Sequence, residues 1–204
     1  QQEIAPTIHF AVPRVWEKQY SLITIKLKEA TALGRLAYDW AIAVGDRAAQ
    51  FRKLDEPVPF GLALVHIVAD FFVLKNIRVL LGIDKCRWLS TAVAPIAPDL
   101  IDWFWALGKP MYEVHGQTEC SGIATANVQG ANRIGSVGRA TEPMEVALSD
   151  AGEILIRGPG VILGYWNNPE KTAETFVQGW LHTGDVGRID DDGYVYIVDR
   201  MKDI

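Results

Sequence analysis

Residues 87–119 read RWLSTAVAPIAPDLIDWFWALGKPMYEVHGQTE, and this stretch decides the fold. Arg87 to Val93 is a short apolar run typical of a buried strand, Pro98 to Leu107 has helical composition, and Met111 to Val114 is a second apolar run. A strand, a helix and a strand in immediate succession predict a right-handed crossover between two parallel strands. Loops 91–95 and 115–119 then leave the same carboxyl edge of the sheet, where open α/β sheets bind ligands.

The residues before this stretch are predicted to be helical. Apolar side chains recur every three or four positions from Trp16 to Val44, which indicates one helical face that Gly34 divides in two. A second helical stretch runs from Phe60 to Leu81. The longest uncharged apolar run, Pro57 to Ala69, is shorter than the roughly 20 residues of a membrane span, so insertion is not expected and peripheral membrane contact stays open.

The residues after this stretch are predicted to be rich in β-structure. A helix at Asn168 to Phe176 interrupts them, with Asn168 as its N-cap and Pro169 at its first position. We therefore predict an α/β portion over residues 1–126 and a β-rich, barrel-like portion over residues 127–204. The expected strands lie at 145–148, 153–157, 186–189 and 194–198.

Composition excludes several classes of function. The net charge is −5, and no basic stripe exists to follow a phosphate backbone, so a nucleic acid partner is not expected. The two cysteines, Cys86 and Cys120, have no spacing typical of a zinc site or a disulfide framework. We expect buried free thiols in a reducing cytoplasm.

Three familiar motifs fail on inspection. GPGVILG at residues 158–164 lacks the dinucleotide-binding spacing, and DDDG at residues 190–193 lacks the other ligand positions of a calcium loop. The four histidines have no metal-binding spacing, and no Gly-x-Ser-x-Gly elbow is present. Dinucleotide, calcium, metallohydrolase and serine hydrolase functions are therefore not predicted.

Three further strings follow one another along the chain: HGQTE at residues 115–119, WLHTGD at 180–185 and DRMKD at 199–203. In this order they resemble the adenylate-forming family of acyl-CoA synthetases, luciferases and nonribosomal adenylation domains. GEI at 152–154 and the segment from Gly164 to Phe176 follow the same pattern, so the resemblance covers nearly the whole chain. VPRVWE at 12–17 and STAVAPIAP at 90–98 resemble the long-chain fatty acyl branch, including its bacterial and bubblegum members.

The resemblance implies the later part of the family's N-terminal domain, and an enzyme that converts a fatty acid and ATP to acyl-AMP and then passes the acyl group to CoA. In HGQTE, Gly116 would allow close backbone approach to a ligand, Thr118 would offer a hydroxyl to the α-phosphate, and Glu119 would offer hard oxygens to Mg²⁺. Without the resemblance, Thr118 and Glu119 would be expected only to cap a helix.

Other residues acquire nucleotide-binding roles by the same resemblance. Asp185 matches the carboxylate that binds the ribose hydroxyls, and Arg200 matches an arginine that reaches the same nucleotide. Lys202 matches the hinge of the family's small C-terminal domain. Taken singly, Asp185 suits a Gly-Asp turn, and the two basic residues suit an exposed strand end.

The adenine slot departs from the family's pattern on both walls. Thr91, Ala92, Val93, Ala94 and Pro95 match one wall, and His115, Gly116 and Gln117 match the other. The family usually has Tyr at the position of His115 and Gly at that of Ala92. An imidazole covers less of the base than a phenol, so we expect weaker stacking that the added methyl group partly compensates.

Trp16 matches an aromatic residue that gates the fatty-acid tunnel, although its helical spacing equally suits a core position. The family's phosphate-binding loop and its C-terminal domain with the catalytic Lys are not found in this sequence, so the remainder of its own chain is an expected partner. Two alternatives to a CoA ligase stay open: a ligase that passes the acyl group to a carrier protein, and a non-catalytic protein that binds an acyl group or a nucleotide.

Overall fold

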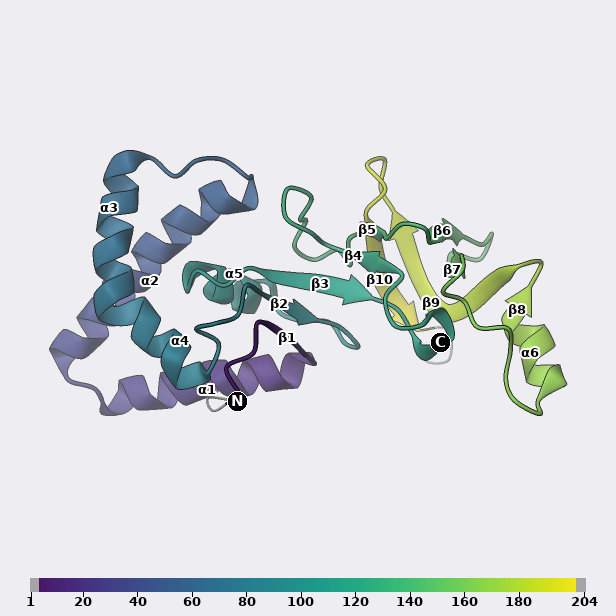
Figure 1. The fold of residues 1–204 in the computed structure, drawn as a ribbon, viewed down its shortest axis with the longest axis horizontal. Coiled ribbons are helices and arrows are strands. Elements are labelled where there is room, and N and C mark those ends of the chain that lie inside the picture. The colour runs from purple at the N-terminus through teal and green to yellow at the C-terminus, as the bar shows by residue number, and fades with distance from the viewer. Residues whose placement is uncertain (1–3, 201–204) are drawn as a thin grey trace. The chain divides into compact units, whose positions relative to one another are not determined.

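The computed structural model describes residues 4–200, and the chain divides into two compact units, Gln1–Tyr112 and Glu113–Ile204. The predicted division after residue 126 lies within the second unit, and as a division of a longer domain it stays a prediction. Strand β3 (Met111–His115) runs from the first unit into the second. The fold is mixed α/β, with one mixed sheet and one curled antiparallel sheet, as the sequence predicts (Figure 1).

The first unit combines two strands with a set of helices. Strands β1 and β2 pair in parallel, with Ile8 opposite Trp88, and β3 follows β2 in the sheet order. Helix α5 packs against α1 and α2, and its Phe104 is buried against Trp16 with the two rings edge to face. Before β3, the elements are β1 (Ile8–Ala11), α1 (Pro13–Glu29), α2 (Ala32–Lys53), α3 (Phe60–Ala69), a π-helical turn (Asp70–Leu74), α4 (Lys75–Leu81), β2 (Trp88–Thr91) and α5 (Pro98–Ala106).

The break between the first two helices lies before Gly34, where the sequence does not predict it. Helix α1 ends at Glu29, and Thr31 is the N-cap of α2, where its side-chain oxygen accepts a hydrogen bond from the Gly34 N–H at 3.2 Å. Gly34 therefore lies in the first turn of α2 rather than at the break, because the capping threonine begins the new helix three residues earlier.

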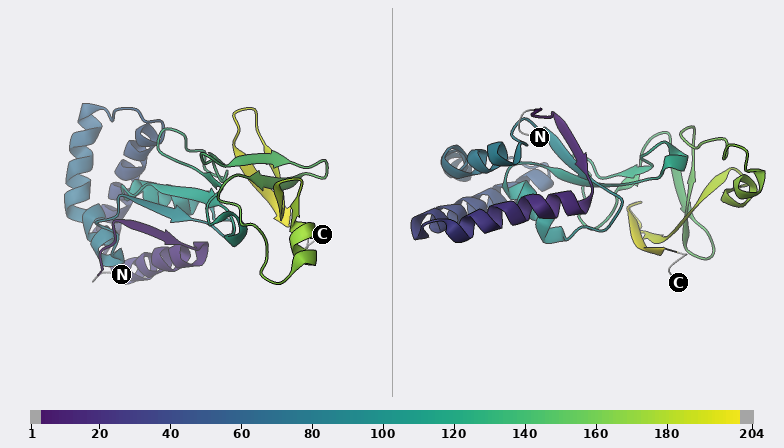
Figure 2. Two further views of the ribbon diagram at one scale, coloured as in Figure 1. Left: turned by 45° about the vertical axis from the view of Figure 1, so that its right-hand side comes forward. Right: turned by 90° about the horizontal axis from the view of Figure 1, so that it is seen from below.

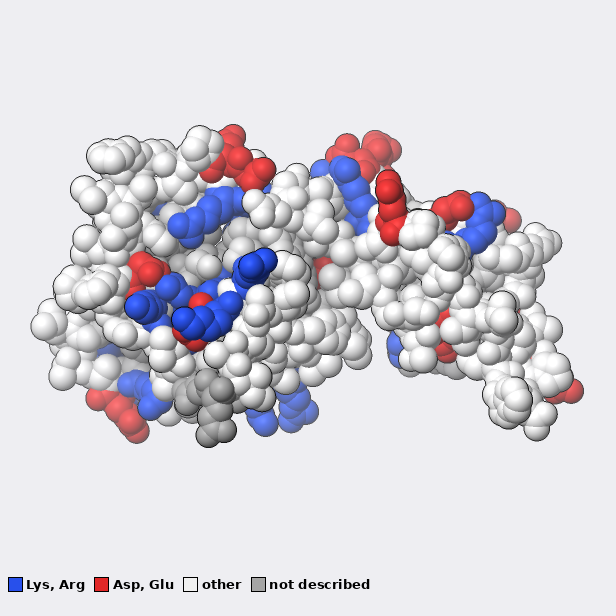
Figure 3. Space-filling view, viewed as in Figure 1, with Lys and Arg blue, Asp and Glu red and all other residues white. Residues whose placement is uncertain are grey.

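The second helical stretch forms as predicted and is more exposed than its composition suggests. Residues Phe60–Leu81 are helical throughout, with a mean hydropathy of 1.7 over the most apolar window, of which only 22% is buried. Counted over this whole length, rather than over its uncharged part alone, the helix is long and apolar enough to cross a membrane. Length and composition are the only grounds for that reading. In Figure 3 the surface over α3 is largely free of charged side chains.

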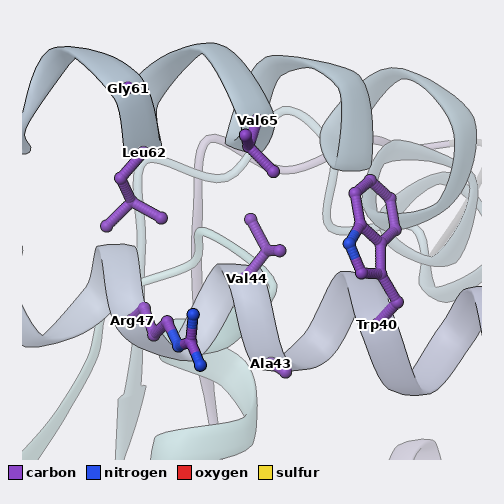
Figure 4. A pocket seen from close by; sticks show the side chains of 7 residues that line it. All are labelled: Trp40, Ala43, Val44, Arg47, Gly61, Leu62 and Val65. Atoms are coloured by element: carbon purple, nitrogen blue, oxygen red, sulfur yellow. The ribbon is translucent and has the colours of Figure 1, made fainter.

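An apolar groove of about 430 Å³ lies between α2 and α3. Figure 4 shows Trp40 and Val44 of α2 facing Leu62 and Val65 of α3, with the guanidinium of Arg47 at one end. None of the residues with a predicted role in nucleotide binding lines this groove.

The second unit is built on antiparallel strands. The end of β3 pairs with β4 (Thr125–Ala126), and β4 pairs with β5 (Arg139–Ala140). A second sheet has the order β10-β9-β7-β6, with β8 also paired to β9, and the bend of β9 curls this sheet (Figures 1 and 2). The other elements are a short 3-10 turn (Thr118–Cys120), β6 (Glu145–Leu148), β7 (Glu153–Arg157), α6 (Pro169–Thr175), β8 (Phe176–Val177), β9 (Trp180–Ile189) and β10 (Val195–Arg200).

Two local predictions for this unit meet different outcomes. Helix α6 begins as predicted, because the Asn168 side chain accepts a hydrogen bond from the Lys171 N–H and Pro169 occupies the first position. The predicted strand at 186–189 is longer than expected, since β9 already begins at Trp180. The TGD string at 183–185 therefore lies inside a strand and not in a turn that leaves one.

Candidate functional site

Asp185 lies in a bulge of β9. Glu153 of β7 pairs with Val186, while Leu155 pairs with His182, so an advance of two residues on β7 corresponds to four on β9. Gly184 has a φ of 74°, in the region that glycine adopts most readily. A bulge bends its strand and redirects the side chains within it. The Asp185 side chain therefore points in a different direction from that of a regularly paired residue.

The Asp185 carboxylate is almost fully buried between two basic side chains. Its Oδ2 lies 3.0 Å from Nε2 of His115 on β3, and its Oδ1 accepts a hydrogen bond from Nε of Arg200 on β10, also at 3.0 Å. Burial alone raises the pKa of Asp185, but these hydrogen bonds and the adjacent charges outweigh burial and hold the pKa below its ordinary value. The carboxylate is therefore ionised at neutral pH.

The contact with Asp185 defines the donor nitrogen of His115. An ionised carboxylate only accepts hydrogen bonds, so Nε2 of His115 carries the proton. The other ring nitrogen, Nδ1, is buried, and it has no hydrogen-bond partner within residues 4–200. The structure thus brings together His115, Asp185 and Arg200, three residues that the family resemblance assigns to one nucleotide.

The loop after β3 is tied to the bulge. Gln117 donates a hydrogen bond from Nε2 to the Thr183 carbonyl at 2.9 Å. A Cβ on Gly116 would lie 2.0 Å from the Gly122 carbonyl oxygen, so glycine is required here by a backbone contact within the protein. This contact explains the glycine without a ligand, and the close approach of a ligand to Gly116 stays a prediction.

Glu119 is half-buried in the short turn that begins at the exposed Thr118. Its Oε1 accepts a hydrogen bond from the Tyr165 hydroxyl at 2.8 Å, and its carbonyl accepts one from the Ile162 N–H. No group of three or more His, Cys, Asp and Glu side chains within residues 4–200 could hold a metal ion. Any metal at Glu119 would thus take most of its ligands from substrate and water, which is the usual preference of Mg²⁺.

The site residues predicted in the first unit lie at the end of β2 and in the core. Thr91 ends β2, and its hydroxyl is buried without a hydrogen-bond partner among the residues that the structure describes. Val93 is exposed with a φ of 81°, which is strained for a β-branched side chain. Trp16 is fully buried in the core, and its indole N–H donates to the Ala11 carbonyl at 3.0 Å.

Three side chains that support the site have no role predicted from the sequence, and one predicted residue lies outside the described range. The three are Tyr165, which holds Glu119, and Glu153 and His182, which flank the bulge. Glu153 is an acidic residue at the start of the apolar run EILIR, and this contrast is the signal that could have drawn attention to it. Lys202, the predicted hinge, lies outside residues 4–200.

Comparison with known proteins identifies the family. The profile described as "AMP-binding enzyme" matches residues 2–166, which is most of the chain. The chain therefore belongs to the AMP-binding enzyme family.

Two relatives carry names of fatty-acid ligases. FadD11 of Mycobacterium tuberculosis, named as a fatty-acid–CoA ligase, is 38% identical over 204 residues, covering 99% of this chain and 36% of that protein. The long-chain-fatty-acid–CoA ligase ACSBG2 of Xenopus laevis is 36% identical over 210 residues, covering all of this chain and 28% of that protein. The chain thus spans about a third of the length of these relatives.

Solved structures agree with this family. A fatty acyl CoA synthetase of Mycobacterium tuberculosis matches with a TM-score of 0.53 at 36% identity, covering 58% of this chain and 26% of its own. The O-succinylbenzoate coenzyme A synthetase of Bacillus subtilis, in complex with ATP and magnesium ion, matches with a TM-score of 0.54 at 25% identity, covering 59% and 28%.

Proposed function

We propose that this chain is part of a long-chain fatty acid–CoA ligase, in which it contributes to binding ATP for the formation of acyl-AMP. The observation that carries the proposal is the buried, ionised Asp185, held by His115 and Arg200 beside the loop that contains Thr118 and Glu119. The names of the relatives support fatty acid and CoA as substrates of the complete ligase, and the matching synthetase structure in complex with ATP and magnesium ion supports ATP.

Asp185 is suited to bind the ribose of a nucleotide. Each oxygen of its carboxylate already takes one hydrogen bond, and each has further lone-pair capacity for a hydroxyl donor. Because its pKa is depressed, the carboxylate keeps its charge at neutral pH, and hydrogen bonds to a charged acceptor are the stronger kind.

Thr118 and Glu119 would act at the phosphates. Glu119 is half-buried and supplies hard oxygens, so it fits a magnesium ion that is also bound by phosphate and water. When bound there, Mg²⁺ would neutralise charge on the phosphates during attack by the fatty carboxylate. The hydrogen bond from Tyr165 orients the Glu119 carboxylate, and the hydroxyl of Thr118 is the protein donor proposed for the α-phosphate.

The remaining assignments rest mainly on the resemblance. We place Thr91 to Pro95 at the adenine base, with the unpartnered Thr91 hydroxyl and the strained Val93 in their support, because backbone strain clusters at ligand sites. Trp16 is proposed as the gate of the acyl tunnel and Lys202 as the hinge. We also propose a cytoplasmic location. Peripheral membrane contact through the exposed apolar surface of α3 is compatible with it.

A thioester-forming assay tests this function. The purified complete ligase, given ATP, Mg²⁺, CoA and fatty acids of increasing chain length, should form acyl-CoA with the long-chain acids. Acyl-AMP that accumulates and passes only to a carrier protein would favour the carrier-protein alternative. Binding of ATP or acid without acyl-AMP formation would show a non-catalytic protein and contradict the proposal.

A further inference from the structure

The bulge that contains Asp185 depends on a side chain from the neighbouring strand. Extra residues in a bulge leave the ladder, so their backbone groups need other partners. Glu153 of β7 supplies one, because its Oε1 accepts a hydrogen bond from the Gly184 N–H at 2.8 Å. Gly184 directly precedes Asp185, so this contact acts on the peptide unit next to the carboxylate.

The second oxygen of the same carboxylate holds the other side of the bulge. Oε2 of Glu153 lies 2.7 Å from Nδ1 of His182, which is the last residue of β9 in regular register before the bulge. Glu153 is 8% exposed, whereas the His182 side chain is 32% exposed. One buried carboxylate therefore spans the bulge from His182 to Gly184.

Within the bulge, Gly184 is the residue whose conformation depends most on Glu153. The Thr183 hydroxyl donates to the Ile154 carbonyl and accepts from the Asp185 N–H, so the residues on both sides of Gly184 are tied. Glycine itself is the residue with the greatest conformational freedom. Without Glu153, this freedom would be available to the segment that carries Asp185, and ordering it would lower the affinity for a ligand.

We propose that Glu153 and His182 are positioning residues that fix the orientation of the Asp185 carboxylate before the nucleotide binds. The proposal rests on the proposed function for what Asp185 binds. Neither residue is expected to touch the nucleotide. Their effect is to keep both carboxylate oxygens of Asp185 in one arrangement with His115 and Arg200.

The test measures KM for ATP separately from KM for the fatty acid in the complete ligase. Glu153→Ala removes both hydrogen bonds that hold the bulge, so it should raise KM for ATP roughly tenfold. His182→Ala, at a partly exposed position that tolerates truncation, should raise it by a smaller factor. In both variants KM for the fatty acid should stay within about twofold of the wild type.

A conservative variant and a matched control separate positioning from general stability. Glu153→Gln keeps an amide oxygen for the Gly184 N–H, and its NH₂ group can donate to His182 in the other tautomer, so it should restore most of the ATP affinity. Glu145 on β6 forms an exposed ion pair with Arg157, and Glu145→Ala should leave both KM values unchanged.

The outcomes distinguish this proposal from the proposed function. An unchanged KM for ATP in an active Glu153→Ala or, if that variant does not fold, in His182→Ala would overturn the positioning role. Equal rises in both KM values would also overturn it, because they indicate a general structural effect. If Asp185→Ala leaves KM for ATP unchanged, the ribose role itself fails, whereas a rise in Asp185→Ala without one in Glu153→Ala removes only the positioning role.

Discussion

His115 contacts the Asp185 carboxylate through Nε2, and its ring therefore has two separable effects on ATP binding. The flat imidazole can cover part of a base, and its Nε2–H holds Asp185. Stacking of a base on an aromatic ring is worth about 1 to 3 kcal/mol, so loss of the ring should be measurable as loss of affinity.

Substitution of His115 tests both effects in the complete ligase. His115→Ala removes ring and hydrogen bond and should weaken ATP binding roughly tenfold, His115→Phe keeps only the ring and should lose less, and His115→Tyr should bind at least as well as the wild type. Calorimetric titration with ATP gives the affinities. If His115→Ala binds ATP as tightly as the wild type, the ring does not stack on the base, and its hydrogen bond to Asp185 does not contribute to nucleotide binding.

Glu119 gives a prediction about metal dependence. Glu119→Gln keeps one neutral oxygen where the carboxylate supplies charge, so the Mg²⁺ concentration for half-maximal pyrophosphate release should rise several-fold. Tyr165→Phe keeps the carboxylate and removes only its hydrogen bond, so it should have a milder effect in the same direction. Identical magnesium curves for Glu119→Gln and the wild type would exclude Glu119 as a ligand.

Glu113 gives a prediction about pH and stability. Burial raises its pKa from 4.5 to about 7, against an opposing hydrogen bond from the Gly135 N–H. A pKa that is higher in the folded state contributes stability that is complete below about pH 4.5 and is lost as the pH rises through about 7. Urea denaturation of the wild type should show a fall in unfolding free energy over this range.

The same experiment on Glu113→Gln should show a smaller fall, because an amide does not titrate. Glu145→Gln, at an exposed position on β6, serves as the control and should follow the wild type. If Glu113→Gln loses stability with pH as steeply as the wild type does, another group is responsible for the loss.

At the scale of helices and strands, the packing of α2 on α5 depends on a glycine. A Cβ on Gly45 would lie 2.1 Å from the Ala106 carbonyl oxygen, so Gly45→Ala should lower the free energy of unfolding by about 1 to 3 kcal/mol. A Cβ on Gly61 in α3 would meet nothing within 4 Å, and Gly61→Ala should raise it by about 0.5 to 1 kcal/mol. Urea denaturation of both variants measures this contrast, and equal stabilities would contradict the close packing.

Sequence pattern predicts the elements of this fold better than their junctions. The order of strand, helix and strand from Trp88 to His115 follows from apolar runs and turn residues, and the cap of α6 follows from Asn168 and Pro169. The pattern predicts the break before α2 at Gly34, whereas the local hydrogen bond of Thr31 decides the helix start.

Strand β9 shows why part of the site could not be predicted. A Thr-Gly-Asp string suits a turn, and its place inside a strand depends on pairing with β7, some thirty residues earlier in the chain. Motif strings indicated His115 and Asp185 separately. Their contact joins residues 70 positions apart, and no local pattern contains it.

At the scale of the whole molecule, each of the two compact units contains residues with a proposed role. The second unit contains His115, Asp185 and Arg200 in direct contact. The first contains the segment Thr91 to Pro95 and a helix with a largely apolar, exposed surface. Since relatives are about three times as long, the chemistry is expected to require the complete ligase.

Fatty-acid-dependent exchange of pyrophosphate into ATP tests the central claim most directly, because it reports reversible formation of acyl-AMP. We predict exchange in the complete ligase and none above background in the chain of 204 residues alone, which spans about a third of the length of its relatives. Asp185→Ala in the complete ligase should reduce the exchange strongly at low ATP. The absence of exchange in the complete ligase with any long-chain acid, or undiminished exchange in Asp185→Ala, would contradict this account.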